Sequence, residues 1–111
     1  MSMDQERIAR LAERADEAAR NATAIQQFST VEDLDVEAAY AVQAASIARR
    51  LQRGECRTGV KMGFTSRAKM VQMGVHDVIW GRLTDAMAEA DGAPLSLRRF
   101  VHPRVEPEVA F

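Results

Sequence analysis

Apolar residues recur at helical spacing near the start of the chain. In residues 3–20 they form a single stripe, so this segment is predicted to be an amphipathic helix. Most members of the stripe are alanines, and the apolar face is therefore shallow. Either Ser2 or Asp4 is the candidate N-cap of this helix. The stripe consists of Ile8, Leu11, Ala12, Ala15, Ala18 and Ala19.

A second helical pattern follows a polar connector over residues 21–34. Asp35 is a good N-cap for a helix over residues 36–54, and Gly54 stands where the C-cap of such a helix is expected. Neither helix gathers titratable groups in one direction. Their charged side chains are therefore interpreted as a solvated face and both helices as structural packing. The mostly apolar positions of the second helix are Tyr40, Val42, Ala44, Ile47, Ala48 and Leu51.

The pattern then changes to short apolar runs that are broken by glycine. Residues 56–64 are predicted to form a strand, and residues 65–74 a short helix. Thr65 or Ser66 would cap this helix at its start, and Gly74 would end it. Its apolar side chains are expected to be buried contacts, namely Met70, Val71 and Met73.

The remaining residues favour short strands and turns, with a surface turn at residues 89–94 and an apolar strand at the end of the chain. His76 and His102 lack a carboxylate or a second histidine at metal-ligand spacing. Each is therefore interpreted as a surface or hydrogen-bonded structural residue. The single cysteine, Cys56, cannot form an internal disulfide and is interpreted as an incidental thiol.

Length and composition restrict the classes of function. The 111 residues are enough for one modest domain and too few for two well-cored ones. The formal net charge of -1 gives no long-range attraction to nucleic acid or to anionic lipid. No segment has the ~20 consecutive apolar residues of a membrane-spanning helix, and the N-terminus lacks the apolar core of a signal peptide. We therefore expect a cytoplasmic protein that binds neither nucleic acid nor membranes.

Lys61 lies in the middle of the predicted strand over residues 56–64. The chain has thirteen arginines and only two lysines, so each lysine stands out. A lysine inside an apolar strand either emerges on a solvent face, which is the commoner case, or is held where a cation is needed. Position alone leaves both alternatives open for Lys61, whereas Lys69 is expected to be exposed.

Glu106 and Glu108 stand near the end of the chain with Pro107 between them. In a strand, side chains alternate between faces, so the two carboxylates would point the same way. Two ionised carboxylates at that separation repel, and a hard divalent cation between them would remove the repulsion. The proline removes a ladder donor and indicates an edge or irregular strand. The alternative is a solvent-exposed acidic strip, which the pair alone favours because two-residue motifs recur by chance.

Four blocks of sequence change that balance, and in chain order they are EAAYAVQ at 37–43, GVKMGFTSRAKMVQMGV at 59–75, IWGRLTDAM at 79–87 and HPRVEPEVAF at 102–111. Together they resemble the 2-oxo acid hydratases and decarboxylases of aromatic meta-cleavage pathways. This family lies within the fumarylacetoacetate hydrolase superfamily. The wording around the lysine and the position of Asp85 are closer to the 4-oxalocrotonate (2-oxo-3-hexenedioate) decarboxylase branch than to the 2-oxopent-4-enoate hydratase branch.

The resemblance implies a site and a reaction. Glu106 and Glu108 would be two of three carboxylate ligands of a Mg²⁺ or Mn²⁺ ion. Lys61 would be the catalytic cation beside the carboxylate and the 2-oxo group of the substrate, and Asp85 a pocket residue grouped with it. The expected enzyme is a lyase that decarboxylates a conjugated 2-oxo diacid to 2-oxopent-4-enoate, with hydration of 2-oxopent-4-enoate as the alternative. A homo-oligomer and a complex with the partner hydratase or decarboxylase are also implied.

The resemblance also implies an α+β fold with two parts. Residues 1–56 would form a helical cap region, and residues 57–111 the first part of a mixed, rolled, barrel-like catalytic sheet. Members of the family are much longer than this chain. These residues are therefore expected to be an N-terminal portion that lacks the third metal ligand and that by itself binds metal weakly and is inactive.

A non-catalytic assembly module is the alternative from another class. The arrangement of four side chains distinguishes the two hypotheses, because an enzyme requires them to converge and an assembly module does not. The four are Lys61, Asp85, Glu106 and Glu108.

Overall fold

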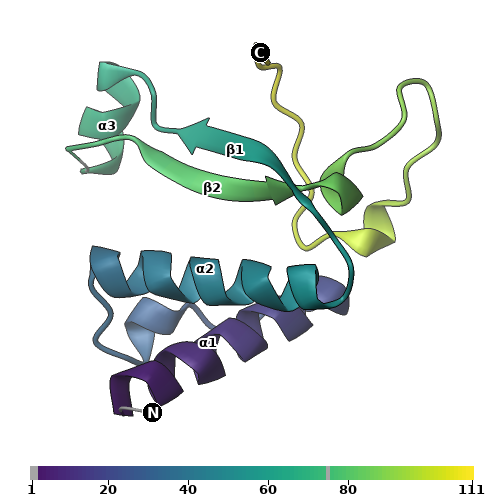
Figure 1. The fold of residues 1–111 in the computed structure, drawn as a ribbon. Coiled ribbons are helices and arrows are strands. Elements are labelled where there is room, and N and C mark those ends of the chain that lie inside the picture. Colours follow the sequence, from purple (N-terminus) through teal and green to yellow (C-terminus); the bar gives the residue numbers. More distant parts are fainter. Residues whose placement is uncertain (1–2, 75) are drawn as a thin grey trace.

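The computed structural model describes residues 3–74 and 76–111, and it places two long helices beneath a β-hairpin (Figure 1). The helix α1 spans Met3–Arg20 and the helix α2 spans Val36–Gln52, as the apolar spacing predicts. Of the two candidate caps of α1, Ser2 lies outside the described residues and Asp4 lies inside the helix. None of the helices in the described part of the chain combines the length and the hydrophobicity that a membrane crossing requires.

The two helices enclose a small hydrophobic core. Leu11 and Ala12 of α1 are 0% and 1% exposed, and Val42 of α2 is 6% exposed. The alanine-rich stripe of α1 supplies little apolar area per turn, so burial at this interface stabilises the pair less than a leucine-rich seam would. Polar contacts between the helices therefore matter more. The partly buried residues that complete this core are Ile8, Phe28, Leu34 and Ala45.

Local capping residues define where α2 begins and ends. The carboxylate of Asp35 accepts a hydrogen bond from the backbone N–H of Ala38 at 2.7 Å, which confirms the predicted N-cap. Gly54 follows the C-cap Arg53 and has a φ of +104°, a conformation that a residue with a Cβ adopts at a cost. The chain turns there and enters the first strand.

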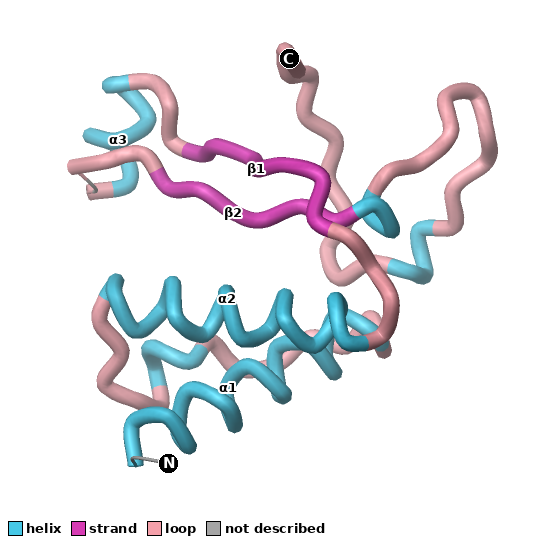
Figure 2. The backbone as a smooth tube through the Cα atoms, in the orientation of Figure 1, coloured by secondary structure: helices cyan, strands magenta, loops and turns pink. Residues whose placement is uncertain are grey.

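The β-hairpin consists of the strand β1, Arg57–Gly63, and the antiparallel strand β2, Ile79–Thr84. The short helix α3, Arg67–Met73, lies in the connection between them (Figure 2). Over residues 3–74 and 76–111 the architecture therefore comprises three α-helices and one two-stranded antiparallel sheet, in agreement with the predicted α+β class. Lys61 lies opposite Gly81 in the register of the two strands.

Side chains of α2 cover the outer edge of β2. Trp80 donates its backbone N–H to the hydroxyl of Tyr40 at 3.2 Å, and its carbonyl accepts from Nε2 of Gln43 at 3.0 Å. The backbone N–H of Arg82 donates to Oε1 of Gln43 at 3.1 Å. The rings of Tyr40 and Trp80 stack with centroids 5.3 Å apart. Since unpaired strand edges must be satisfied or covered, these contacts fix the hairpin on the helical layer and leave the edge of β1 as the open one.

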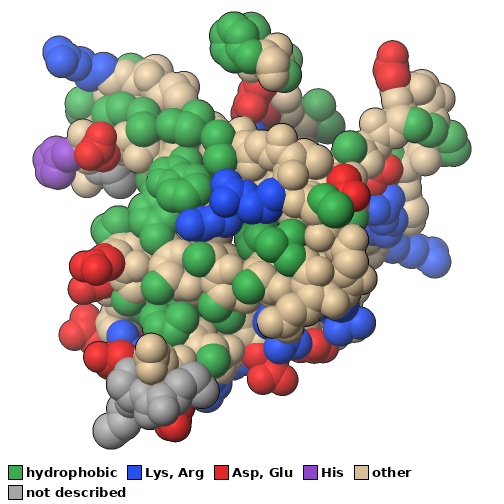
Figure 3. All heavy atoms as spheres, in the orientation of Figure 1, with side chains coloured by type: hydrophobic (Ala, Val, Ile, Leu, Met, Phe, Trp, Pro, Cys, Tyr) green, Lys and Arg blue, Asp and Glu red, His purple; other side chains and the backbone are tan. Residues whose placement is uncertain are grey.

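The helix α3 projects from the end of the hairpin. Ser66 caps it by accepting a hydrogen bond from the N–H of Lys69 at 3.1 Å, and Gly74 ends it with a φ of +70°, as predicted. The expected burial is wrong for Val71 and Met73, which are 75% and 52% exposed, whereas Met70 is half-buried. Figure 3 shows hydrophobic side chains gathered over α3 and the adjacent part of the hairpin.

The end of the chain is an exposed loop. Residues 103–111 form neither helix nor strand, so the expectation of a terminal strand is wrong for this structure. A strand requires a partner for its backbone groups, and this segment forms no strand pairing in the described structure. Val105 and Val109 are 96% and 84% exposed. The segment ends on the side of the hairpin away from α1 and α2 (Figure 2).

Candidate metal-binding site

Lys61 projects from the face of the hairpin that is turned away from α2. The ring of Trp80 stacks on Tyr40 of α2, so Trp80 faces the helical layer. Neighbouring residues of a strand point to opposite faces, which places Gly81 and its partner Lys61 on the other face. Gly81 has no side chain, and apart from its two chain neighbours no residue has a heavy atom within 4 Å of the position that a Cβ would occupy there. The structure therefore leaves open space beside Lys61.

The two predicted acidic ligands converge on the ammonium group of Lys61. Its Nζ donates a hydrogen bond to Oε1 of Glu108 at 2.6 Å and lies 3.9 Å from Oε2 of Glu106. All three side chains remain in contact with water, with exposed fractions of 50% for Lys61, 69% for Glu106 and 46% for Glu108. Three of the four predicted site residues thus form one cluster, which we call the lysine–glutamate cluster.

The cluster changes the protonation equilibria of its members. The hydrogen bond from Lys61 holds the pKa of the Glu108 carboxyl below its usual range, and a hydrogen bond with Glu106 lowers it further. In return, the hydrogen bond to Glu108 raises the pKa of the Lys61 ammonium group, against a smaller opposing effect of burial. The ion pair therefore favours a charged amine beside a charged carboxylate.

Asp85 lies at the other end of the hairpin from the lysine–glutamate cluster. Its carboxylate accepts a hydrogen bond from the backbone N–H of Cys56 at 3.0 Å, and its own N–H donates to the carbonyl of Cys56 at 2.9 Å. Cys56 precedes Lys61 by five residues, which corresponds to roughly 15 Å along a strand. The observed contacts of Asp85 hold the start of β1 against the end of β2, and its catalytic role stays a prediction.

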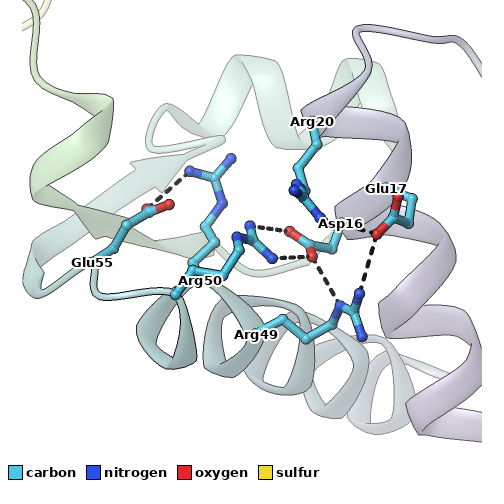
Figure 4. A network of polar contacts seen from close by, with 7 residues as sticks. Asp16, Glu17, Arg20, Arg49, Arg50 and Glu55 are labelled. Carbon is cyan, nitrogen blue, oxygen red and sulfur yellow. Dashed lines mark hydrogen bonds and ion pairs between the residues drawn. The ribbon is translucent and has the colours of Figure 1, made fainter.

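A buried ion-pair network joins α1 to α2, and the sequence reasoning missed it. Asp16 is 1% exposed, and its carboxylate accepts two hydrogen bonds from Arg53, at 2.6 and 2.8 Å, and one from Nε of Arg49 at 2.9 Å. Figure 4 shows Arg49 reaching both Asp16 and Glu17 from α2. The interpretation of all helix charges as a solvated face is therefore wrong for these residues. Asp16 follows Ala12 at helical spacing and thus continues the buried stripe, a signal that could have identified it.

The arginines set the protonation state of Asp16. The hydrogen bonds from Arg53 and the one from Arg49 lower the pKa of the Asp16 carboxyl to about 2, although burial acts in the opposite direction. Asp16 raises the pKa of both guanidinium groups in turn. This network is structural, because it connects two helices and includes none of the four predicted site residues.

A second polar contact joins the end of α2 to the end of β2. Thr84 is 1% exposed, and its hydroxyl donates to Oε1 of Glu55 at 2.6 Å. The same oxygen accepts from Nη1 of Arg50 at 3.2 Å (Figure 4). Together with the contacts of Tyr40 and Gln43, this link holds the hairpin in a defined position over α2.

Other candidate ligands do not assemble in the described part of the chain. Among residues 3–74 and 76–111, no three or more histidine, cysteine, aspartate or glutamate side chains lie together in a way that could hold a metal ion. Cys56 carries an exposed free thiol, and His76 and His102 are exposed. The lysine–glutamate cluster accordingly offers two carboxylates as protein ligands.

The chain is similar in sequence to two groups of lyases, the 4-oxalocrotonate decarboxylases and the 2-keto-4-pentenoate hydratases. It is 49% identical to a 4-oxalocrotonate decarboxylase of a Pseudomonas species over 105 residues, which are 95% of this chain and 41% of that protein. It is 36% identical to a 2-keto-4-pentenoate hydratase of Burkholderia vietnamiensis over 108 residues, 96% of this chain and 41% of the relative. The chain thus spans about two fifths of the length of these curated relatives. No family model matches the sequence.

A solved structure agrees with these relatives. The 4-oxalocrotonate decarboxylase of Pseudomonas putida G7 superposes with a TM-score of 0.71 at 36% identity, covering 77% of this chain and 33% of that one. Structures of that protein are complexed with calcium and acetate and with magnesium and adipate. The three helices and the antiparallel hairpin of this chain match its N-terminal part.

Proposed function

We propose that this chain contributes to a metal-dependent lyase active site. It corresponds in sequence and fold to the N-terminal part of the 4-oxalocrotonate decarboxylases and the related 2-oxo acid hydratases. The reaction proposed is decarboxylation of a conjugated 2-oxo diacid to 2-oxopent-4-enoate. The observation that carries the proposal is the convergence of Glu106 and Glu108 on Lys61. The proposal therefore puts a metal ion and a cation for the substrate on one face of the hairpin.

The donor set of the lysine–glutamate cluster fits a hard divalent cation. Mg²⁺ and Mn²⁺ prefer oxygen ligands, and the two carboxylates supply these. The ammonium group of Lys61 lies 2.6 Å from a carboxylate oxygen of Glu108 and 3.9 Å from one of Glu106, so this position accommodates positive charge. Glu106 and Glu108 would hold the ion. When bound, it would polarise the keto group of a 2-oxo acid and accept negative charge that develops there.

Lys61 has two roles in the proposed reaction. Its ammonium group would bind the anionic end of the substrate through a charge-assisted hydrogen bond. Loss of carbon dioxide from the far end of the conjugated acid leaves a dienolate, and the same ammonium group would stabilise the charge on the dienolate oxygen. A Schiff base is not required. Space beside Gly81 supports this assignment, since a shallow cavity of about 200 Å³ adjoins Lys61 there.

Asp85 is proposed as a pocket residue of the complete site. Its present hydrogen bond with Cys56 holds one end of the hairpin, so its carboxylate would act from a fixed position. We further propose the division into a helical cap region, residues 1–56, and the first part of a rolled, barrel-like sheet, residues 57–111. The open edge of β1 supports this division, because Val60 and Met62 on that strand are 50% and 44% exposed.

Hydration of 2-oxopent-4-enoate is the second candidate, and the 36% identity to a 2-keto-4-pentenoate hydratase supports it. Both reactions pass through a related dienol, so the same cluster would serve either one. The higher identity to the decarboxylase favours decarboxylation. A cytoplasmic location, a homo-oligomer and a complex with the partner enzyme are parts of this proposal.

The test joins residues 1–111 of this chain to the remaining part of the 49% identical Pseudomonas decarboxylase. The chimera should release carbon dioxide from a conjugated 2-oxo diacid only with Mg²⁺ or Mn²⁺. Glu106→Gln and Glu108→Gln should abolish that turnover, whereas the exposed Glu89→Gln should not. Metal-dependent turnover that survives both site variants would refute the ligand assignment. Water addition without carbon dioxide release would transfer the proposal to the hydratase.

A further inference from the structure

Lys61 forms an internal ion pair with the acidic residues that are proposed to hold the metal. Within residues 3–74 and 76–111, Lys61 is the only cation that pairs with Glu106 or Glu108. Its contact with Glu108 is short, with 2.6 Å between Nζ and Oε1. The amine thus lies where a bound cation would interact with the same oxygen.

A divalent ion and the ammonium group cannot both keep this position. Oxygen ligands approach Mg²⁺ to about 2.1 Å, so an ion on Oε1 of Glu108 would lie within a few ångströms of Nζ. Two cations at that separation repel each other strongly. Entry of the metal therefore requires the ammonium group to leave Glu108.

We propose that Lys61 is a built-in occupant of the metal site, which a divalent cation displaces, and that this displacement frees its ammonium group for an anionic substrate. The proposal rests on the metal-binding role of Glu106 and Glu108 given above. It adds an order to the binding steps: the metal ion binds first, and the 2-oxo acid then meets an ammonium group that is no longer held by Glu108.

The structure allows this exchange to occur at low cost. Lys61 is half exposed on a flexible four-carbon stem, so its head can reach water or a substrate while its backbone stays in β1. Glu108 lies in a loop without strand pairing, so a small shift of this residue breaks no ladder hydrogen bond. Open space beside Gly81 lies on the same face and can receive the released side chain.

A Mn²⁺ titration of the 111-residue chain, followed by electron paramagnetic resonance of the free ion, tests the competition. Lys61→Met should tighten Mn²⁺ binding by about twofold to fivefold, the range that corresponds to loss of one exposed ion pair. Lys69→Met is the matched control, because Lys69 is the other lysine and lies exposed on α3. This control should leave the affinity unchanged. Equal affinities for the two variants, or weaker binding by Lys61→Met, would overturn the proposal.

Glutamine variants separate this proposal from the one on which it rests. Glu106→Gln and Glu108→Gln should weaken Mn²⁺ binding. If neither does, the metal-ligand assignment fails, and the present inference fails with it. If both weaken binding while Lys61→Met does not strengthen it, only the competition is wrong.

The displacement itself can be observed by NMR spectroscopy of the lysine Nζ groups in protein labelled with ¹⁵N-lysine. Two lysines give two signals, and the Lys61→Met and Lys69→Met variants assign them. Addition of Mg²⁺ should shift the Lys61 signal and leave that of Lys69 in place. An unmoved Lys61 signal at metal saturation would contradict the displacement.

Discussion

Replacement of Asp16 by asparagine tests the buried ion-pair network between α1 and α2. The substitution keeps the size of the side chain and removes its charge, so Arg49 and Arg53 lose their shared carboxylate. The depression of the Asp16 pKa from 3.8 to about 2 corresponds to about 2 kcal/mol, since one pKa unit is about 1.4 kcal/mol. The side chain of Asp16 is fully buried, so solvent does not screen this interaction strongly. We expect Asp16→Asn to lower the free energy of unfolding by about 2 kcal/mol at pH 7.

The effect has a defined pH dependence. Because the pKa of Asp16 is lower in the folded than in the unfolded state, its stabilisation is complete above pH 4 and is lost as the pH falls toward 2. The difference between wild type and Asp16→Asn should therefore shrink over that interval.

Urea denaturation monitored by circular dichroism at pH 7 and at several values between pH 4 and 2 measures this difference. In a chain of this size, 2 kcal/mol corresponds to a fall in Tm of about 10 °C. Asp91→Asn, at an exposed turn, is the control and should change stability by less than about 0.5 kcal/mol. Equal stability of the two variants at pH 7, or a wild-type advantage that is as large at pH 2 as at pH 7, would refute the reasoning.

Three further predictions concern the hairpin and the site. Gln43→Ala removes two hydrogen bonds to the backbone of β2 and should destabilise the fold by about 1–3 kcal/mol. The fluorescence of the single tryptophan should change as well, and an unchanged emission spectrum would contradict the role of Gln43 in holding the hairpin on α2. Gly74→Ala should cost about 1–2 kcal/mol in urea denaturation because of the positive φ, whereas Ala68→Gly in the same helix should cost about 1 kcal/mol or less. Gly81→Val in the chimera should fill the space beside Lys61 and lower kcat/KM for carbon dioxide release at least tenfold, with an unchanged Tm. Full activity would show that the substrate does not occupy this space.

The helices and their ends could be predicted because their causes are local. Asp35 and Ser66 accept hydrogen bonds from N–H groups three residues ahead, and Gly54 and Gly74 end helices through their own backbone conformation. Such signals lie within a few residues of one another, and tertiary packing did not override them.

Contacts between distant segments could not be predicted in the same way. Asp16 and Arg53 are 37 residues apart, and a charge pattern on one helix does not reveal which residue of another helix will face it. Likewise, the exposure of Val71 depends on which elements pack against α3, and the spacing of apolar residues within α3 does not reveal those elements. The prediction of a terminal strand was wrong for a related reason, because a strand exists only where a partner satisfies its backbone groups.

Neighbours in sequence are enough to specify the helices, the strand that carries Lys61, the acidic pair and the family resemblance. Folding, in contrast, brings Lys61 to Glu106 and Glu108, keeps Asp85 apart from them, and buries Asp16 between arginines. The physical reason is that charges and strand edges are stabilised by whichever groups folding brings within a few ångströms, and separation in sequence does not specify those distances.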